Sequence, residues 1–468
     1  MNVARAAASS VNWFERISYA LPALALAAVG IPVYVHLPKF YTDVIGVSVG
    51  TVGAFILAAR LFDAVSDPLV GWLSDGFSSR FGRRRPLIAL AAPPLALSFG
   101  LLFSPPAMST GAAGLWFGAW LFATFLFWTL VTVPYEALGP ELSSDYDERT
   151  TLLGTRDGFL LLGTLLAAAA PAMIGGVLGL GTSAVDERQR FLTLGLVYAP
   201  LVILSCWWCV AVLRERAPRP APRKPIRGAM RQNRPFRILL LSYVVAAFGS
   251  NLPGALLLYY VEYVLQSASA NLFLVEYLVT GVVALPLWIL LSRRIGKKRT
   301  WILSMLLNTG AFTGVFLLGP GDVGAYAALV VLSGLGLGAT LALPSSLQAD
   351  VIDYDELLTG ERREGRYIGV WAVARKAAAA LGVGVALPLI GLAGYVPNVE
   401  QTPQVIFMLR VLYALVPTVC NLVAIAIAVG YPIDRARHQE ILDAIAARQR
   451  GEVVTDPLRP EIEIGATA

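Results

Sequence analysis

Two carboxylates lie four residues apart in an apolar stretch of the chain. They are Asp63 and Asp67, in the segment 60–68, which reads RLFDAVSDP. Residues four apart lie on one face of a helix, so both carboxylates are within reach of one bound cation. Arg60 precedes Asp63 by three residues, and counting its charge leaves the group with one net negative charge. This arrangement suits a monovalent cation or a proton. A buried structural ion-pair network is the alternative.

Other ionisable residues also fall within or near apolar stretches. An ionisable residue in a bilayer costs at least ~2.5–3.5 kcal/mol, so each one calls for a partner or a function. Lys376 lies about ten residues, or about 15 Å, into its stretch, which is too deep for easy snorkelling. A lysine beside the aspartates would compete with the cation, so Arg60 and Lys376 are the predicted coupling network. Glu136 either lines the cavity or caps an inner gate.

The composition requires a membrane protein to position these residues. Of 468 residues, 56% are hydrophobic and 15% charged, whereas soluble domains carry about 25% charged residues. The apolar residues form twelve runs, each able to cross a bilayer as a helix of about 20 residues. The loops left over are too short for a large soluble catalytic domain. The predicted spans are 15–38, 49–74, 86–104, 112–138, 150–178, 191–213, 237–264, 269–292, 300–319, 323–350, 366–393 and 407–431.

A proline-rich segment divides the chain into two halves of six spans. Residues 214–236 contain five prolines, which neither form a helix nor bury a core. We therefore expect an N-terminal bundle at 1–213, a cytoplasmic linker at 214–236, a C-terminal bundle at 237–431 and a cytoplasmic tail at 432–468. The tail is expected to form a brief helix near 441–447 and then to be disordered.

The basic residues predict the orientation in the membrane. Most of the 37 Lys and Arg residues fall in segments on the same side as the N-terminus. Basic loops stay in the cytoplasm, so both termini are expected there. The net charge of +6 is then mostly a topology signal, and nucleic acid binding is not expected.

Three short motifs occur in both halves in the same order. Residues 41–43 (YTD) match 260–262 (YVE), residues 81–85 (FGRRR) match 295–299 (IGKKR), and residues 133–135 (VPY) match 343–345 (LPS). The third motif is followed in each half by an acidic stretch, 141–149 or 350–356. These echoes indicate a duplicated six-helix unit with the substrate between the halves. Ion pairs between the acidic and basic loops would form an inner gate, with candidates Asp75, Arg83, Arg84, Glu141 and Asp350.

These motifs resemble the major facilitator superfamily, and within it the glycoside–pentoside–hexuronide:cation symporters typified by the melibiose carriers. The superfamily resemblance lies in 71–75 (GWLSD) and 80–84 (RFGRR). The closer resemblance lies in 63–68 (DAVSDP), 40–43 (FYTD), 133–135 (VPY), 348–354 (QADVIDY) and 394–398 (GYVPN), and it spans nearly the whole chain. It implies an all-α membrane protein of twelve helices in two pseudo-symmetric bundles.

The resemblance also implies roles for individual residues. Asp63 and Asp67 would be the cation carboxylates, Thr129 a hydroxyl ligand, Lys376 the basic residue beside them, and Arg156 a substrate-facing donor. Such an oxygen set suits Na⁺, while the carboxylates alone could carry H⁺.

The sugar pocket departs from the melibiose carriers. The two acidic residues that bind the sugar there align with Ala27 and Thr132, and the aromatic residue on which the sugar stacks aligns with Glu136, next to Tyr135. Paired carboxylates grip sugar hydroxyls through charge-assisted hydrogen bonds, so their loss weakens the case for a galactoside. Another glycoside, an organic acid drawn to Arg156, and a lysophospholipid, as in the related animal lysolipid symporters, all remain open.

The expected function is therefore a Na⁺- or H⁺-coupled symporter for a small solute, most simply a sugar or glycoside. An uncoupled facilitator is the alternative if the aspartate pair is structural. An enzyme is not expected, because two separate histidines and the absence of nucleophile or metal motifs provide no catalytic set. We expect no cofactor or metal beyond the coupling ion, a monomer, and a place in the inner membrane.

Overall fold

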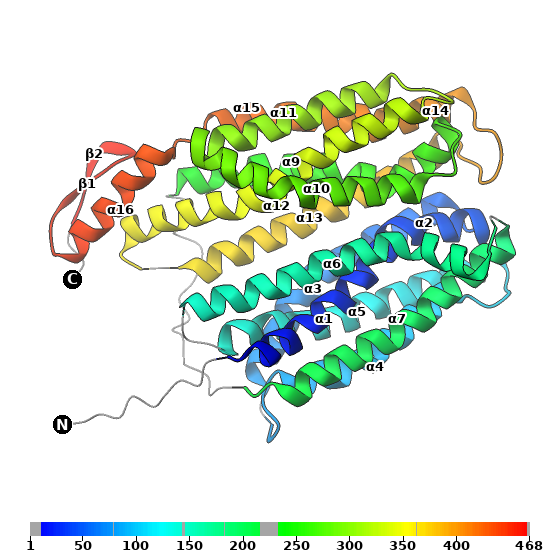
Figure 1. The fold of residues 1–468 in the computed structure, drawn as a ribbon, viewed down its shortest axis with the longest axis horizontal. Helices are drawn as coiled ribbons and strands as arrows, with labels where there is room; N and C mark the ends of the chain where they lie inside the picture. The colour runs from blue at the N-terminus through cyan, green and yellow to red at the C-terminus, as the bar shows by residue number, and fades with distance from the viewer. Residues whose placement is uncertain are drawn as a thin grey trace. The chain divides into compact units, whose positions relative to one another are not determined.

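The computed structural model is almost entirely helical (Figure 1). It describes residues 11–77, 79–142, 146–181, 183–215, 233–361 and 363–465. The chain divides into two compact units, which are described separately. The first contains Met1–Ala221 and Tyr395–Val399, and the second contains Pro222–Gly394 and Glu400–Ala468.

The first unit consists of six long helices, the first of which continues through two π-helical turns (η1 and η2). Its elements are α1 (Trp13–Ile31), η1 (Pro32–His36), α2 (Leu37–Lys39), η2 (Phe40–Val44), α3 (Val49–Gly76), α4 (Arg85–Phe103), α5 (Thr110–Leu142), α6 (Tyr146–Leu178) and α7 (Ala184–Val212).

The second unit repeats this plan and ends in an additional helix and hairpin. Its elements are α9 (Arg234–Tyr259), η3 (Tyr260–Val264), α10 (Ala270–Ile295), α11 (Lys297–Phe316), α12 (Val323–Thr359), α13 (Glu364–Leu392), α14 (Pro403–Arg410), η4 (Val411–Leu415), α15 (Val416–Val429), α16 (Arg435–Gln449), β1 (Val454–Asp456) and β2 (Arg459–Ile464).

The helices of the two units pack in the same pairs. The contacts of α1 with α6 and α7 correspond to those of α9 with α13 and α15. Likewise, α5 packs against α3 and α4 as α12 packs against α10 and α11, and α4 meets α7 as α11 meets α15. The predicted fold of two pseudo-symmetric six-helix bundles is confirmed.

The sequence echoes occupy equivalent positions in the two units. The YTD and YVE motifs fall on the π-helical turns η2 and η3. The hydroxyl of Tyr41 donates to the carbonyl of Leu102 at 2.7 Å, and that of Tyr260 donates to the carbonyl of Val315 at 2.8 Å. Each tyrosine thus ties the end of the first helix of its unit to the third helix.

Eleven helical segments of the described chain are long and apolar enough to span a membrane. The segment that falls short of this test is α11, whose first turn contains Lys297, Lys298 and Arg299. Its packing against α12 and α15 matches that of α4 against α5 and α7, so it is the third helix of the second six-helix bundle.

The C-terminal tail is structured, so the expectation of disorder after a brief helix is wrong for residues up to 465. Helix α16 runs from Arg435 to Gln449, and β1 pairs antiparallel with β2. Ile441 and Ile464 are buried in the same hydrophobic core as helices α9 and α12. The tail is mostly polar, and its few apolar residues are widely spaced, so the sequence did not suggest a packed structure. These few residues are enough for packing because α12 covers them.

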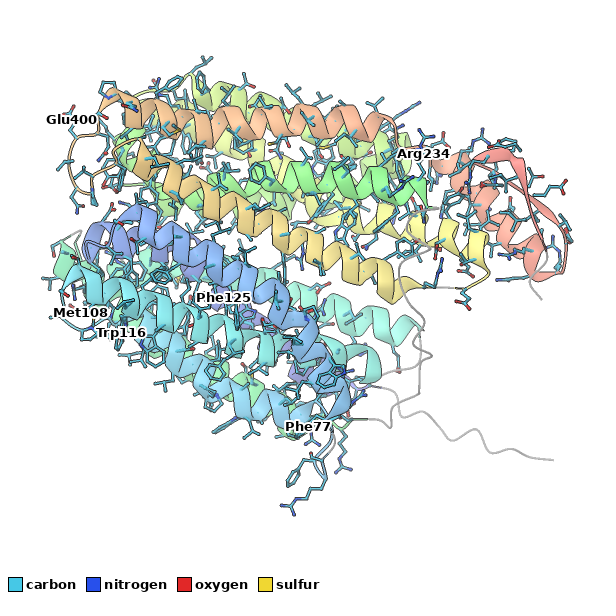
Figure 2. All side chains as sticks on the ribbon, turned by 180° about the vertical axis from the view of Figure 1, so that it is seen from behind. Phe77, Met108, Trp116, Phe125, Arg234 and Glu400 are labelled. Atoms are coloured by element: carbon cyan, nitrogen blue, oxygen red, sulfur yellow. The ribbon has the colours of Figure 1, made fainter. Side chains whose placement is uncertain are left out.

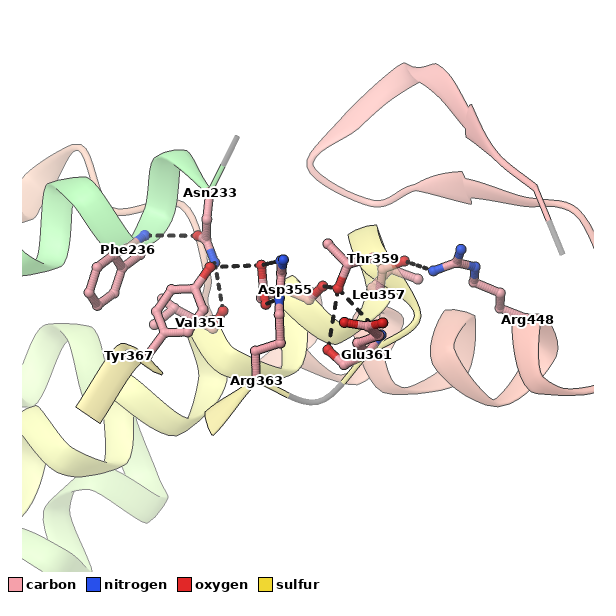
Figure 3. Close-up of polar contacts among 10 residues, drawn as sticks. All are labelled: Asn233, Phe236, Val351, Asp355, Leu357, Thr359, Glu361, Arg363, Tyr367 and Arg448. Atoms are coloured by element: carbon pink, nitrogen blue, oxygen red, sulfur yellow. Dashed lines mark hydrogen bonds and ion pairs between the residues drawn. The ribbon is translucent and has the colours of Figure 1, made fainter. Parts of the chain in front are cut away.

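Polar contacts also bind the tail to the end of α12 (Figure 3). Arg448 donates to the carbonyl of Leu357 at 2.7 Å, and the hydroxyl of Tyr354 donates to buried Asp456 at 2.8 Å. Next to them, Asp355 accepts two hydrogen bonds from Arg363, at 2.6 and 2.8 Å, and one from Tyr367 at 2.7 Å. The tail is therefore an integral part of the second unit.

Docking of α16 is expected to weaken as the pH rises. The Nε2 atom of His438 lies 3.0 Å from Asp353 and 3.5 Å from Asp350. The positive charge of Lys297 acts in the opposite direction to these carboxylates and lowers the pKa of His438. The hydrogen bond with Asp353, reinforced by Asp350, raises the pKa of His438. Stabilisation by protonated His438 is then complete below its ordinary pKa of about 6.5 and is lost as the pH rises through the raised value.

Hydrogen exchange of the α16 amides between about pH 6 and pH 9, corrected for intrinsic exchange, would test this expectation. We expect protection to fall up to about fivefold with rising pH, equivalent to about 1 kcal/mol for a partly exposed pair. The variant His438→Gln should lose this dependence. An unchanged pH dependence in that variant would assign it to another group.

Residues Tyr395–Val399, in the loop between α13 and α14, belong to the first unit, although both flanking helices belong to the second. The hydroxyl of Tyr395 donates to the Asp43 carboxylate at 2.7 Å, and the Asn398 side chain donates to the Asp43 carbonyl at 2.6 Å. Lys39 also binds the Asp43 carboxylate, at 2.8 Å. The YTD and GYVPN motifs, distant in sequence, therefore meet in one hydrogen-bonded cluster.

Candidate functional site

The two aspartates of α3 meet a hydroxyl of α5. The Thr129 hydroxyl lies 2.8 Å from Oδ1 of Asp63 and 3.1 Å from Oδ1 of Asp67. Asp63 and Thr129 are buried, while Asp67 is partly exposed. A hydroxyl has one proton to donate, so it serves one carboxylate at a time and keeps lone pairs available. The three side chains form the oxygen-rich group that the sequence predicts, and their role in cation binding stays a prediction.

Local sequence explains why the aspartates share one face of α3. Ser48 caps the helix by accepting the Thr51 amide proton at 3.2 Å, and the i, i+4 spacing then aligns Asp63 with Asp67. Pro68 lies inside this helix, where it removes one backbone hydrogen bond one residue after Asp67. The Ser66 hydroxyl donates to the Asp63 carbonyl at 3.2 Å, which fixes the same turn.

The predicted coupling residues lie in different units. Arg60 is on α3, and its guanidinium nitrogen lies 3.9 Å from Oδ2 of Asp63. Lys376 is on α13, in the second unit. Within the first unit, Arg60, Asp63 and Asp67 together carry one net negative charge.

A second polar cluster in the first unit contains three of the predicted substrate residues. Arg156, on α6, lies within electrostatic range of Glu136 and of Tyr19 on α1. It also binds Asp157 at 2.7 Å. The Tyr135 hydroxyl donates to the Tyr19 carbonyl at 2.6 Å, and the two rings pack with centres 4.9 Å apart. The cluster combines a cation, an exposed carboxylate and two aromatic rings.

The other two predicted substrate residues contribute less polar character. The Thr132 hydroxyl donates to the Trp128 carbonyl of its own helix at 2.9 Å. Ala27 is a buried alanine on α1. Neither of these two positions offers a carboxylate.

The basic loop before α4 binds a carboxylate that the sequence analysis missed. The Glu215 carboxylate accepts the backbone protons of Arg83, Arg84 and Arg85 at 2.6, 2.8 and 2.7 Å. Gly82, with φ of +109°, permits this approach, since a Cβ there would lie 2.8 Å from the carboxylate. The cap satisfies amide groups at the start of α4 and complements its dipole.

The remaining inner-gate candidates are only partly described. Asp350 pairs with Lys297 at 2.5 Å within the second unit, which joins the acidic stretch there to the basic motif. The side chains of Asp75 and Glu141 lie outside the described part of the structure. A gating role for the five candidates stays a prediction.

Replacing Glu215 with Ala is expected to destabilise the first unit by about 1–3 kcal/mol. The reason is that three backbone donors lose a charged acceptor at the start of α4. Thermal unfolding of the purified protein in detergent would measure the loss. Glu440→Ala is the matched control, because Glu440 forms an exposed ion pair on α16. Equal melting temperatures for both variants would contradict a stabilising cap.

Sequence reasoning also missed three aromatic residues near the site, Tyr19, Tyr34 and Phe125. All three occur in apolar stretches, where a ring that faces lipid and one that faces a charge look alike in sequence. Gly139 offered one weak signal, because a Cβ there would collide with the ring of Tyr19.

Comparison with known proteins places this chain in a family. Residues 18–435 match the family model described as MFS/sugar transport protein. A glucuronide carrier protein homolog from Escherichia coli strain K12 is 28% identical over 449 residues, covering 94% of this chain and 97% of that relative. An isoprimeverose transporter from Lactiplantibacillus pentosus is 28% identical over 443 residues, covering 92% of this chain and 91% of that relative.

Solved structures support the fold. A bacterial homolog of the human lysosomal transporter Spinster, in an inward-facing and unoccupied conformation, superposes with a TM-score of 0.65 at 14% identity. The match covers 92% of this chain and 98% of that one. The resemblance to the glycoside–pentoside–hexuronide symporters is confirmed. The chain belongs to the MFS/sugar transport protein family, and it is a multi-pass membrane transporter of small molecules rather than an enzyme.

Proposed function

We propose that this protein is a symporter that uses Na⁺ or H⁺ to move a sugar or glycoside across the inner membrane by alternating access. The observation that supports coupling is the convergence of Asp63, Asp67 and Thr129 inside the first unit. A carboxylate pair within membrane helices is costly unless it serves a function. Three oxygens from two helices also match the preference of a hard cation for oxygen ligands.

The substrate we favour is a sugar that bears an acidic group. Arg156 lies near Tyr19 and Tyr135 and its side chain is partly exposed, so the cluster offers a positive charge to an anionic group, beside two buried aromatic rings. A guanidinium binds a carboxylate through paired hydrogen bonds. The names of the relatives, a glucuronide carrier homolog and an isoprimeverose transporter, support a sugar-type substrate.

We also propose the oligomeric state, the membrane orientation and the cofactor requirement of the protein. It acts as a monomer, with both termini in the cytoplasm and with no cofactor other than the coupling ion. The excess of basic residues on the side of the N-terminus supports this orientation.

Calorimetric titration of the purified protein with Na⁺ at two pH values would test the coupling. Saturable Na⁺ binding that weakens at low pH is the expected result for a sodium symporter, because protons compete for the same carboxylates. Proton uptake without Na⁺ binding would indicate H⁺ coupling. If neither ion binds, the aspartate pair is structural and the protein is an uncoupled facilitator.

A further inference from the structure

The second unit contains a cavity of about 110 Å³ between its helices. Its walls come from α9, α10, α11 and α12 and from the π-helical turn η4. Helix α9 can be followed in Figure 2 from its first residue, Arg234. Most of the lining is apolar, and its buried members include Leu257, Phe273, Ala311 and Val330. A cavity lined in this way lowers the stability of a helix bundle unless a molecule fills it.

Hydrogen-bonding side chains interrupt this apolar lining. The buried hydroxyls of Tyr326 and Tyr413 lie 2.6 Å apart, and because one donates to the other, the proton of the accepting hydroxyl is available for a further bond. The Tyr277 hydroxyl has no hydrogen-bond partner among the described residues. The Asn308 carbonyl oxygen accepts from Ser333 at 3.0 Å, which leaves the amino group of Asn308 as a donor. The described lining residues thus offer several donors, and none of them is acidic or basic.

The equivalent place in the first unit has a different polarity. Tyr41 and Tyr260 mark this place, because each donates from its hydroxyl to the third helix of its unit. The Tyr41 ring packs against Phe117 on α5, with ring centres 4.5 Å apart. The Tyr260 ring packs against Tyr326 on α12 and Tyr413 on η4, with centres 5.8 and 4.3 Å away. The second unit therefore carries hydroxyls on rings beside its tyrosine, although a phenylalanine ring suffices for packing in the first.

The size and lining of the cavity define the class of molecule that fits. An apolar cavity of about 150 Å³ holds one benzene molecule, so the cavity in the second unit has room for one molecule of about that size or slightly smaller. A charged molecule would lose its hydration without gaining a partner of opposite charge. A neutral molecule with one oxygen atom would satisfy the donors while its apolar part contacts the leucine, valine and phenylalanine side chains.

We propose that this cavity is a binding site for one small neutral molecule with a hydroxyl group on an aromatic ring or a short alkyl chain, the class of phenols and short alcohols. The hydroxyl hydrogen-bonds with Tyr277 and with the Tyr326–Tyr413 pair. The site lies in the second unit, whereas Asp63, Asp67 and Arg156 lie in the first, so it does not depend on the proposed symport function.

Fluorine NMR of the purified full-length protein in detergent would test the site, with para-fluorophenol and fluorobenzene as probes. The two probes differ by one hydroxyl. We expect para-fluorophenol to bind saturably with a dissociation constant of about 0.1–1 mM, in the range open to a ligand of this size. Fluorobenzene is expected to bind about threefold to tenfold more weakly, because it makes no hydrogen bond. Detergent micelles without protein give the contribution of partitioning, which does not saturate.

Two kinds of variant assign the binding to this cavity. Ala311→Leu fills the space with a larger side chain and is expected to abolish saturable binding of both probes. Val330→Phe fills the space from α12 and serves the same purpose if Ala311→Leu does not fold. Tyr277→Phe removes one hydroxyl and is expected to weaken para-fluorophenol about threefold to tenfold while leaving fluorobenzene unchanged. Tyr198→Phe is the matched control, because Tyr198 lies in the first unit and its buried hydroxyl also has no partner among the described residues.

Three results would overturn the proposal. The first is a probe signal that does not saturate in the wild-type protein, which would mean that the probes only enter the micelle. The second is binding of wild-type strength in folded cavity-filling variants, which would place the probe elsewhere. The third is equal affinity for the two probes in the wild-type protein, which would show that the hydroxyl is not recognised.

Discussion

Replacing Asp63 with Asn is expected to abolish cation binding and cation-driven accumulation of substrate. Asparagine keeps the shape of the side chain and can still accept the Thr129 proton, but it removes a negative charge that is 4% exposed. The remaining charges, Arg60 and Asp67, then sum to zero. Loss of a buried charge partner costs at least ~3 kcal/mol, which corresponds to a loss of more than 100-fold in affinity.

Uptake of labelled substrate into proteoliposomes with an imposed Na⁺ or proton gradient would measure this loss. Calorimetric titration would show whether binding itself is lost. Asp186→Asn is the matched control, because Asp186 is a carboxylate in the first turn of α7 within the same unit. If Asp63→Asn still accumulates substrate against its gradient, the aspartate pair has a structural role.

Replacing Arg156 with Lys is expected to reduce the affinity for an acidic sugar by about 10-fold to 150-fold. Lysine keeps the positive charge but loses the planar fork that pairs with a carboxylate, and charge-assisted hydrogen bonds are worth about 1.5–3 kcal/mol. The position is sensitive because Arg156 also lies near Tyr19 and Glu136, so a shorter ammonium group cannot reproduce all its contacts. Cation binding at the aspartates should be unchanged.

Competition assays with a glucuronide and with its neutral glucoside would separate charge recognition from ring recognition. We expect the variant to lose affinity for the glucuronide and to retain affinity for the neutral glycoside. Arg188→Lys, on α7, controls for the substitution itself. A loss of equal size for both sugars would argue against an acidic substrate group.

The duplication was predictable because the same short motifs recur in both halves of the chain. The YTD and YVE motifs fall on equivalent π-helical turns, and Gly82 and Gly296 of the FGRRR and IGKKR motifs both adopt a positive φ. Such turns depend on a few neighbouring residues, so a short sequence pattern is enough to identify them. The acidic pair was predictable for the same reason, since i, i+4 spacing alone places both side chains on one helix face.

The partners of the predicted residues were less predictable. Glu215 binds the loop before α4 from a position over 130 residues away in sequence. It follows α7 at the start of a basic, proline-rich segment, where sequence offers no reason to distinguish it from a solvated carboxylate. The tail was missed for a related reason, because Ile441 and Ile464 are buried only when α9 and α12 are already packed.

The membrane class, the duplicated six-helix plan and the pairing of Asp63 with Asp67 could all be predicted from the sequence. Each of these follows from hydropathy, periodicity or spacing within one segment. The contacts of Arg60 with Tyr34 and Phe125, and the position of Arg156 near Tyr19, depend on how the helices pack. The physical reason is that an aromatic ring in an apolar span has the same sequence signature toward lipid and toward a charge, and helix packing chooses between them.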